Sequence, residues 1–317
     1  MICKYFQDRP FQLVLHRGSA VIVGMNSLRN TKAMSTGYAY PPPSDGKPFR
    51  LNMGLRSLDE ELWLEAGDDL LAQIPERLQL ANEEREIVYQ ELPGYQSAIA
   101  ELIVRISNNL AKFHGDDYLV TTDSITHLPT ESVVPLNTPD VLLHLAAIIG
   151  EDLVVLSRED GEWKIVAGAV LFPSRWKLSE KIGKGMNAVH TPVPGFAEAL
   201  APYMTATFDK ISADRAVWRK NWSLHSTVHL HQPTSIHEPA NPEDYWWRTE
   251  RQTLTRAAEG DFLYFTIRNR AEPLAWIKSD SQSAAAFAET LASFAPETIA
   301  YKGLQKDHQR IVDYLRQ

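Results

Sequence analysis

Two histidines separated by one residue, His229 and His231, are the first candidates for chemistry. The stretch from Trp222 to His231 alternates apolar and polar residues, which predicts a β-strand. Because successive side chains on a strand point to opposite faces, both imidazoles are expected on one face. Such a pair binds a non-haem metal when a carboxylate or a third histidine converges on it. The alternative is a solvated outer sheet face, where histidine, serine and threonine are common.

A third histidine, His190, begins the segment His190-Thr191-Pro192-Val193-Pro194-Gly195. The two prolines restrict the backbone and remove two amide donors, so the segment is predicted to be stiff. A histidine on a stiff segment suits a role that needs fixed geometry, such as binding a metal. The alternative is a packed or hydrogen-bonded loop histidine.

Arginines are frequent between residues 215 and 268, and a guanidinium group can bind a carboxylate through two parallel hydrogen bonds. Arg219 and Arg251 lie beside aromatic-rich predicted strands, which favours partial burial, whereas most surface arginines are only solvated. Arg251 and Arg256 are expected on opposite faces of one strand, so they cannot share one function. Glu250 is a candidate partner for one of these arginines in a structural ion pair.

Several familiar chemical motifs are absent. No G-x-x-x-x-G-K-S/T motif occurs and no G-x-G-x-x-G follows a predicted strand, so neither a P-loop nor a Rossmann dinucleotide site is indicated. The G-x-S-x-G elbow and the H-E-x-x-H helix are also missing. Cys3 is the only cysteine, which excludes an internal disulfide and a four-cysteine iron–sulfur or zinc site within the chain.

Composition narrows the class of protein. The 317 residues are 44% hydrophobic and 23% charged, which is ordinary for a folded chain with one large domain or two modest ones. The net charge of −8 argues against nucleic acid as the main partner, because phosphate binding usually requires a basic field. We find no apolar run of about 18 residues and no signal peptide. We therefore expect a cytoplasmic protein that does not span a membrane.

Helical periodicity marks the first half of the chain. Apolar residues recur with helical spacing over 71–78 and over 99–110. Leu92-Pro93-Gly94 separates these two helices. Thr138-Pro139-Asp140 predicts an N-cap with proline at the first helical position, opening a short helix that ends at Ile149.

Strands dominate from residue 153 onward. Two β-rich runs, 153–156 and 163–172, are joined by a turn that ends in Asp160-Gly161, which predicts a hairpin. A helical stripe runs from Phe196 to Ile211. The remaining predicted elements are three strands followed by two helices: 222–231, 248–256 and 262–268, then 283–294 and 296–315.

This order of elements predicts an α+β fold, with an antiparallel sheet whose helices pack to one side, preceded by a helical region. Two strands, intervening helices and three strands are also the connectivity of a PAS domain, whose sheet and helices enclose a pocket. We therefore divide the chain into an irregular N-terminal arm or linker over 1–52, a helical region over 53–150, and a PAS-like core with C-terminal helices over 151–317.

Several short segments occur in an order that resembles one family. Met53-Gly54-Leu55-Arg56 precedes the helical region, and Glu151-Asp152-Leu153 opens the core. The others, in order, are Phe172-Pro173-Ser174-Arg175-Trp176, Lys181-Ile182-Gly183, the His190–Gly195 segment, Arg219-Lys220-Asn221-Trp222 and Glu250-Arg251-Gln252-Thr253-Leu254. Over roughly 53–268 the chain thereby resembles the haem-dependent oxidative N-demethylases, whose haem-binding subunit has a PAS-like core.

The resemblance implies a b-type haem in the PAS-like pocket, where O₂ is activated to oxidise an N-methyl group. The oxidised product would then collapse to a shorter amine and formaldehyde. The resemblance favours His190 as the axial ligand over the loop role considered above, since neutral imidazole is a normal haem ligand. The haem propionates would need cations, for which Lys181, Arg219 and Arg251 are candidates.

A small secondary methylamine is the implied substrate. Its alkylammonium group would favour a carboxylate or an aromatic wall, so Glu250 and Trp222 are the candidate catalytic residues. The reductant must come from elsewhere, because this chain has one cysteine and no dinucleotide motif. The resemblance implies a separate flavin/iron–sulfur reductase subunit as the donor. The alternative is a stand-alone relative with a different donor.

Three other functions stay open. The first is a haem-binding PAS-like gas or redox sensor without catalysis, and the second is a non-haem metal protein that uses His229 and His231. The third is a cofactor-free binding or scaffolding protein. The visible absorption spectrum of the purified protein separates the haem functions from the other two.

Overall fold

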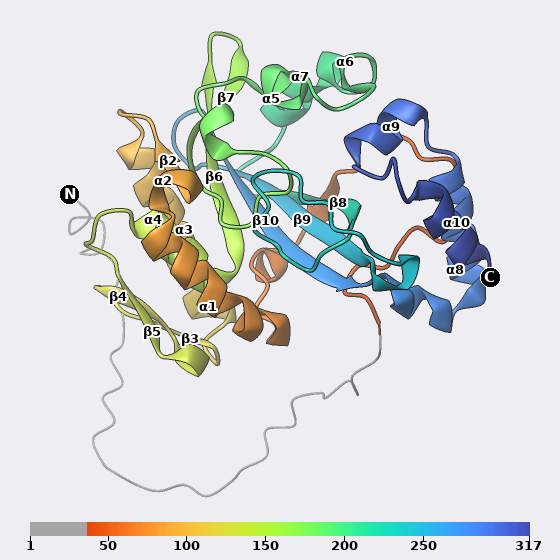
Figure 1. Cartoon of the computed structure of the whole chain (residues 1–317). Helices are drawn as coiled ribbons and strands as arrows, with labels where there is room; N and C mark the ends of the chain where they lie inside the picture. Colours follow the sequence, from red (N-terminus) through yellow and green to blue (C-terminus); the bar gives the residue numbers. More distant parts are fainter. Residues whose placement is uncertain (1–36) are drawn as a thin grey trace, which may run out of the picture.

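A computed structural model describes residues 37–317 of the chain (Figure 1). Cys3 and most of the predicted arm therefore lie outside the described residues. Residues 37–50 contain no helix or strand, as the sequence predicted for this part of the arm. None of the helices in the described part of the chain combines the length and apolar character that a membrane crossing requires.

The centre of the described structure is a seven-stranded antiparallel sheet with the order β1-β8-β9-β10-β6-β7-β2. The combination of helices with an antiparallel sheet confirms the predicted α+β class. The two outermost strands have three residues each and come from the region before residue 150. The strands are β1 (Arg56–Leu58), β2 (Tyr89–Glu91), β6 (Glu151–Glu159), β7 (Glu162–Ala169), β8 (Ala216–His225), β9 (Trp246–Arg256) and β10 (Phe262–Pro273).

The predicted hairpin is confirmed as β6–β7. Glu159 pairs with Glu162, so the turn consists of Asp160 and Gly161, with φ angles of 50° and 80°. Two consecutive positive φ angles define the tight turn whose twist matches that of the flanking strands, and Asp-Gly is a preferred sequence for it.

Helices cover both faces of the sheet, so the prediction of helices on one side is wrong. The reason is that β6 is buried along most of its length, and its side chains belong alternately to two cores. Leu153 and Val155 pack in the core under the N-terminal helices, whereas Val154 and Leu156 pack in the core on the opposite face. A strand with two apolar faces needs cover on both.

The first face is covered by α1 (Asp68–Glu83), α2 (Arg85–Val88), α3 (Gln96–Phe113) and α4 (Val141–Ile149). The predicted stripe of α3 is confirmed, because its apolar members from Ile99 to Leu110 are all buried. The predicted start of α4 is wrong by two residues. Asp140, with φ of 56°, stands at the N-cap, so Thr138 does not cap the helix and Pro139 is not its first residue.

The predicted helical region also contains a small three-stranded sheet with the order β3-β4-β5. Its strands, of three or four residues, are β3 (Tyr118–Val120), β4 (Ser124–His127) and β5 (Ser132–Pro135). Strands this short contain too few residues for an alternation of apolar and polar side chains to be recognised in the sequence.

The second face is covered by α5 (Met186–His190), α6 (Phe196–Ala199) and α7 (Ala201–Asp209). The predicted stripe from Phe196 to Ile211 forms two helices that break at Leu200, next to Pro202 at the start of α7.

A third core lies where Trp222 and Trp247 project from β8 and β9. It is covered by α8 (Ser281–Ala292), α9 (Pro296–Tyr301) and α10 (His308–Arg316), at the right of Figure 1. The single helix predicted over 296–315 is two helices, which separate around Gly303 with its φ of 68°. Short 3₁₀ helices complete the described elements: η2 (Glu60–Leu62), η3 (Leu128–Thr130), η4 (Leu178–Glu180), η5 (Pro242–Asp244) and η6 (Leu274–Ser279).

The strand predicted over 222–231 lies at 216–225 instead, as β8. Its neighbour β9 begins at Trp246, which pairs with His225, so no partner continues the ladder beyond that residue. His229 and His231 therefore lie after the strand, and the prediction that they share a strand face is wrong.

Candidate functional site

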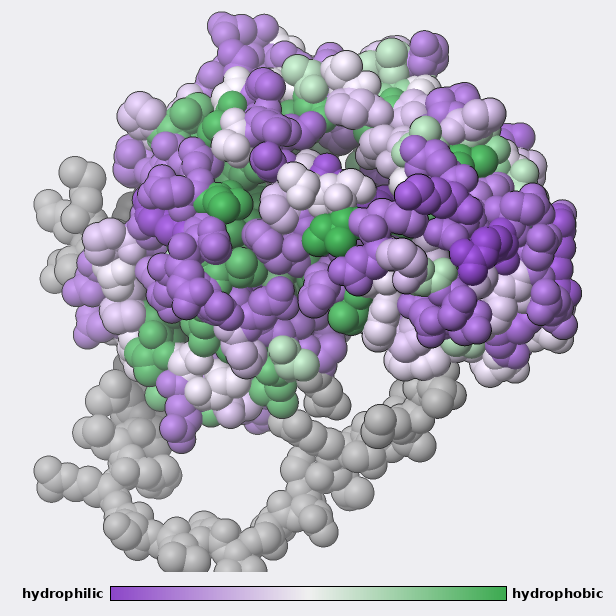
Figure 2. All heavy atoms as spheres, viewed as in Figure 1, coloured by the Kyte–Doolittle hydropathy of each residue, from purple (hydrophilic) through white to green (hydrophobic). Residues whose placement is uncertain are grey.

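A cavity of about 550 Å³ lies between the second face of the sheet and helices α5–α7, and α9 contributes to its wall. Residues of five strands, β6 to β10, line it, and together they give it both apolar and polar side chains. The apolar lining residues include Val154, Leu156, Leu254, Phe265 and Ile267 from the strands and Met186, Phe196, Leu200, Met204 and Phe208 from the helices. The surface of the molecule is mostly hydrophilic in the view of Figure 2.

His190 lines this cavity as the last residue of α5, one residue before the proline-rich segment in which the sequence placed it. The half-buried imidazole stacks on Phe196, with ring centroids 4.9 Å apart. Its Nδ1 lies 2.8 Å from the carbonyl oxygen of Met186. A carbonyl only accepts hydrogen bonds, so Nδ1 carries the proton and donates it.

The environment of His190 favours the neutral imidazole. Burial lowers its pKa, and the charges of Lys181 and Arg219 lower it further, against the opposing effect of the hydrogen bond to Met186. No described residue hydrogen-bonds Nε2. The site therefore presents a neutral imidazole whose Nε2 lone pair is uncommitted, which is the state that binds a metal.

The other two candidate histidines do not form a metal site among residues 37–317. Nδ1 of His231 donates to the carbonyl of Leu171 at 2.7 Å, and the backbone carbonyl of His229 accepts from Gln232. The described residues contain no group of three or more histidine, cysteine, aspartate or glutamate side chains that could hold a metal ion. His190 has no such group around it either, so a metal there would need its other ligands from a cofactor.

Two of the three cations predicted for anion binding line the cavity. Burial lowers the pKa of Lys181, whose ammonium donates to the carbonyl of Val189. Burial also lowers the pKa of Arg219, against the opposing charge of Glu250. No described side chain pairs with the guanidinium of Arg219, and its Nε is buried without a hydrogen-bond partner. Arg219 is thus a cation available to a ligand.

Arg251, the third predicted cation, lies on the other face of β9, away from the cavity. It is nearly fully buried, its Nε is 3.1 Å from Glu65, and it donates to the carbonyls of Leu62 and Trp63. Strand alternation places adjacent Glu250 and Arg251 on opposite faces. Arg251 therefore links the sheet to the N-terminal region, and the described structure does not bring it to the cavity.

Glu250 and Trp222 both line the cavity and are both 9% exposed. Oε2 of Glu250 accepts hydrogen bonds from Asn221 at 3.2 Å and Gln252 at 2.9 Å, which are both neutral amides. Among residues 37–317, no cation lies within 4.0 Å of this carboxylate. The cavity thus holds a buried carboxylate with one uncommitted oxygen and no counter-ion from the described chain.

Two further cations at the cavity were not identified from the sequence. Lys302 follows α9 and is 7% exposed, and burial lowers its pKa to about 8. Arg175 has a φ of 64°, and burial lowers its pKa as well. Arg175 belongs to one of the family segments, but no sequence pattern shows a positive φ. Lys302 lies 48 residues after Leu254, where the last family segment ends, so it had no local signal.

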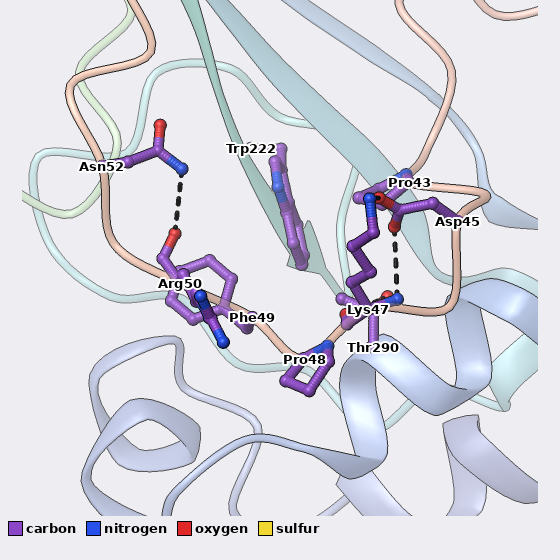
Figure 3. Close-up of a pocket in the computed structure, with 9 residues that line it drawn as sticks. All are labelled: Pro43, Asp45, Lys47, Pro48, Phe49, Arg50, Asn52, Trp222 and Thr290. Atoms are coloured by element: carbon purple, nitrogen blue, oxygen red, sulfur yellow. Dashed lines mark hydrogen bonds and ion pairs between the residues drawn. The ribbon is translucent and has the colours of Figure 1, made fainter.

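A second hollow, of about 450 Å³, lies against Trp222 and the chain segment 43–52 (Figure 3). Phe49 and Trp222 line both spaces, with ring centroids 6.0 Å apart. The segment is fixed to α8, because Phe49 N donates to Ser293 Oγ at 2.9 Å and Thr290 Oγ1 donates to the carbonyl of Lys47 at 3.0 Å. Residues 43–52 therefore form part of the wall at the Trp222 end of the cavity.

Comparison with known proteins identifies the family. No curated protein matches the chain. Residues 54–312, most of the described structure, match the family described as haem-dependent oxidative N-demethylase, alpha subunit-like. Of the cavity-lining residues named above, all except Phe49 lie within this match. The chain belongs to the family of haem-dependent oxidative N-demethylase alpha subunit-like proteins.

Proposed function

We propose that this protein binds a b-type haem in the cavity and, with electrons from a partner, oxidatively removes the methyl group of a small secondary methylamine. The observation that carries the proposal is the state of His190. Its Nδ1–H is committed to Met186, which leaves Nε2 as the ligand atom. A metal-binding histidine usually donates its other ring N–H to a carbonyl or carboxylate in this way.

The residues around the cavity suit a haem. A volume of about 550 Å³ falls within the range of roughly 300–1,000 Å³ that is common for cofactor sites, and apolar side chains dominate the lining. Lys181 and Arg219 bind the two propionates, since both cations lie at the cavity without a carboxylate partner from the described chain. The sequence has no C-x-x-C-H attachment motif, which favours non-covalent binding. When bound, haem supplies the activation of O₂.

The order of strands supports a PAS-like core. Strands β6 and β7 precede helices α5–α7, and β8, β9 and β10 follow them. In the sheet, β6 lies between β7 and β10, so the first strand of this set is central. The helices between the two groups of strands close one face over the cavity, as expected for a PAS-like pocket.

Glu250 binds the ammonium group of the substrate. A buried carboxylate without a counter-ion is costly, and a cationic ligand removes that cost. The uncommitted Oε1 accepts a hydrogen bond from an N–H of the ammonium group and thereby keeps the proton on the nitrogen of the bound substrate. Asn221 and Gln252 donate to the other oxygen and fix the position of the carboxylate. Trp222 adds an aromatic wall, to which a methylated ammonium is attracted.

Electrons come from a flavin/iron–sulfur reductase subunit. The family description names an alpha subunit, which agrees with an assembly of several chains. The sequence itself contains no dinucleotide motif and only one cysteine, so the reducing cofactors belong to the partner.

Expression with added haem, followed by visible spectroscopy and haem extraction, tests the first part of the proposal. We expect about one haem per chain, and protein without a Soret band or extractable haem would overturn the proposal. Formaldehyde release from dimethylamine, with reductase and NADPH, tests the second part, and a dithionite-only reaction serves as its control. A fully haem-loaded and reduced protein that demethylates no methylamine would point to the sensor function instead.

A further inference from the structure

Arg175 and Lys302 are cations of the cavity that the proposed haem site does not use. The ammonium of Lys302 donates to the backbone carbonyl of Trp222 at 2.8 Å, and Arg175 Nη1 donates to the carbonyl of Lys302 at 2.6 Å. Asn221, which precedes Trp222, donates to Glu250. These contacts join the two cations and the carboxylate into one continuous end of the cavity.

Neither cation has a charged partner in the described structure. No described carboxylate lies within 4.0 Å of Lys302 or Arg175, and Nε of Arg175 is buried without a hydrogen-bond partner. The Lys302 ammonium also lies 4.4 Å from the centroid of the Trp222 ring. Burying a cation is costly unless an anion or several hydrogen bonds compensate it, so these groups indicate an anionic ligand.

The backbone of Arg175 provides independent support. Its φ of 64° lies in the left-handed region, which residues other than glycine rarely adopt. The conformation is maintained by hydrogen bonds from Arg175 N to the Gln232 carbonyl at 2.7 Å and from Nη2 to the Leu224 carbonyl at 3.1 Å. Such strain persists where the surrounding structure holds it, and it is concentrated at functional sites. Here it directs a guanidinium group along the cavity wall.

Glu250 lies near these cations but does not neutralise them. Burial lowers the pKa of both Arg175 and Lys302, and the charge of Glu250 opposes this only in part, since neither cation comes within 4.0 Å of it. The end of the cavity therefore has a negative subsite and a positive subsite that stay apart. Lys181 and Arg219 already supply one cation for each haem propionate, so the positive subsite is left for another anion.

We propose that the substrate is a zwitterionic N-methylamine, that is, a small N-methyl amino acid, with its ammonium at Glu250 and its carboxylate at Lys302 and Arg175. This inference rests on the proposed function of the same cavity. It also adds a restriction, because a simple alkylamine has no group for the positive subsite. Lys302 and Arg175 are then specificity residues that select for the carboxylate.

The test compares the binding of N-methylglycine and dimethylamine by calorimetry, to both haem-loaded and haem-free protein. We expect tighter binding of N-methylglycine. Lys302→Met should weaken N-methylglycine binding by about tenfold or more, as loss of a buried charge-assisted hydrogen bond does, and should leave dimethylamine binding nearly unchanged. Lys302→Arg, which keeps the charge, should retain the preference and covers the case in which the methionine variant does not fold.

Lys278→Met is a matched control. The Lys278 ammonium also donates to a backbone carbonyl, of Tyr314 at 3.1 Å, and lies 5.2 Å from the Tyr314 ring centroid, but it is not part of the cavity lining. This variant should bind both ligands as the unmodified protein does.

Three results would overturn the inference. The first is equal affinity for the two ligands, or no binding of either, and the second is equal weakening of both by Lys302→Met. The third is reduced haem retention in Lys302→Met without a change in ligand preference, which would assign the cation to a propionate. Failure of the proposed function is distinguishable, because it appears as missing haem or missing turnover, whereas ligand preference is measured in the haem-free protein as well.

Discussion

At the scale of single residues, one backbone carbonyl determines what His190 can do. By accepting the Nδ1 proton, the Met186 carbonyl fixes the tautomer and orients the ring, and the Phe196 ring restricts its tilt. The sequence indicated the residue through its family segment, but the tautomer depends on an i−4 contact within α5 that only the fold creates.

His190→Ala should abolish or strongly weaken haem binding, because the alanine variant lacks the only imidazole that lines the cavity among the described residues. His229→Ala and His231→Ala are the controls, and both should retain haem. Haem content and the resonance Raman spectrum after purification measure the outcome. A spectrum of His190→Ala that equals that of the unmodified protein would eliminate His190 as the ligand.

Glu151 gives a residue-scale prediction for pH. It is fully buried on β6, and burial raises its pKa from 4.5 to about 7, against the opposing charge of Arg268. Between these two pH values the folded protein holds one proton more than the unfolded chain, so its free energy of unfolding falls as the pH rises through this window.

Glu151→Gln should remove that dependence. The variant should match the unmodified protein near pH 4.5 and become progressively more stable than it up to about pH 7, after which the difference stays constant. Urea unfolding at several pH values measures this difference, and the exposed Glu61→Gln is the control. A difference that does not change with pH would contradict the raised pKa.

At the scale of elements, a buried ion pair fixes the end of β7. Arg77 of α1 and Asp152 of β6 are 2.9 Å apart with no exposed side-chain surface. Asp152 also accepts hydrogen bonds from the backbone amides of Leu171 and Phe172. The chain immediately after these residues leads to Arg175, so the pair supports the cavity wall from the opposite face of the sheet.

Asp152→Asn should destabilise the protein by about 3–5 kcal/mol, because it leaves the Arg77 charge buried without compensation. The matched control is Asp45→Asn, which removes an exposed ion pair with Lys47 and should change the free energy of unfolding far less. Urea denaturation measures both values. Equal effects of the two substitutions would show that the buried pair contributes no more than the surface pair.

The elements that could be predicted are those with a strong local pattern. The apolar stripe of α3 and the Asp160-Gly161 turn each carry their own signal, and both predictions are confirmed. The boundaries of β8 could not be predicted, because the strand ends where its partner β9 begins, more than 20 residues later in the chain. Likewise, the three-residue strands β1 and β2 exist only because long strands offer them an edge.

In the site, too, residues with a local sequence signal could be predicted, whereas residues that depend on distant parts of the chain could not. Five of the six candidate residues, namely His190, Lys181, Arg219, Glu250 and Trp222, line one cavity. Arg251 does not line it. Because Arg251 directly follows Glu250 on one strand, the alternation of side chains already indicated that the two face opposite sides of the sheet. The positions of Lys302 and Arg175 at the cavity could not be predicted from the sequence. Lys302 belongs to a distant C-terminal segment, and the placement of Arg175 depends on an unusual backbone angle.

At the scale of the whole molecule, the proposed reaction needs a second protein. We expect no demethylation from the haem-loaded chain with NADPH alone, and sustained formaldehyde release after a flavin/iron–sulfur reductase is added, because O₂ activation consumes electrons that this chain cannot obtain from NADPH. Quantification of formaldehyde and amine over many turnovers measures this. Turnover by the isolated chain with NADPH would contradict the partner requirement.

The placement of β1 and β2 at the two edges of the sheet has a consequence for how the chain can be divided. Residues 151–317 contain the five long strands, but the two edge strands, β1 and β2, come from the segment before residue 151. A fragment that starts at residue 151 would lose the three-residue pairings of β1 with β8 and of β2 with β7. Both edges of the sheet would then have longer unpaired stretches of backbone, and such edges recruit other chains. We expect this fragment to self-associate during expression, and addition of residues 53–150 as a separate chain to restore a monodisperse, dissolved complex.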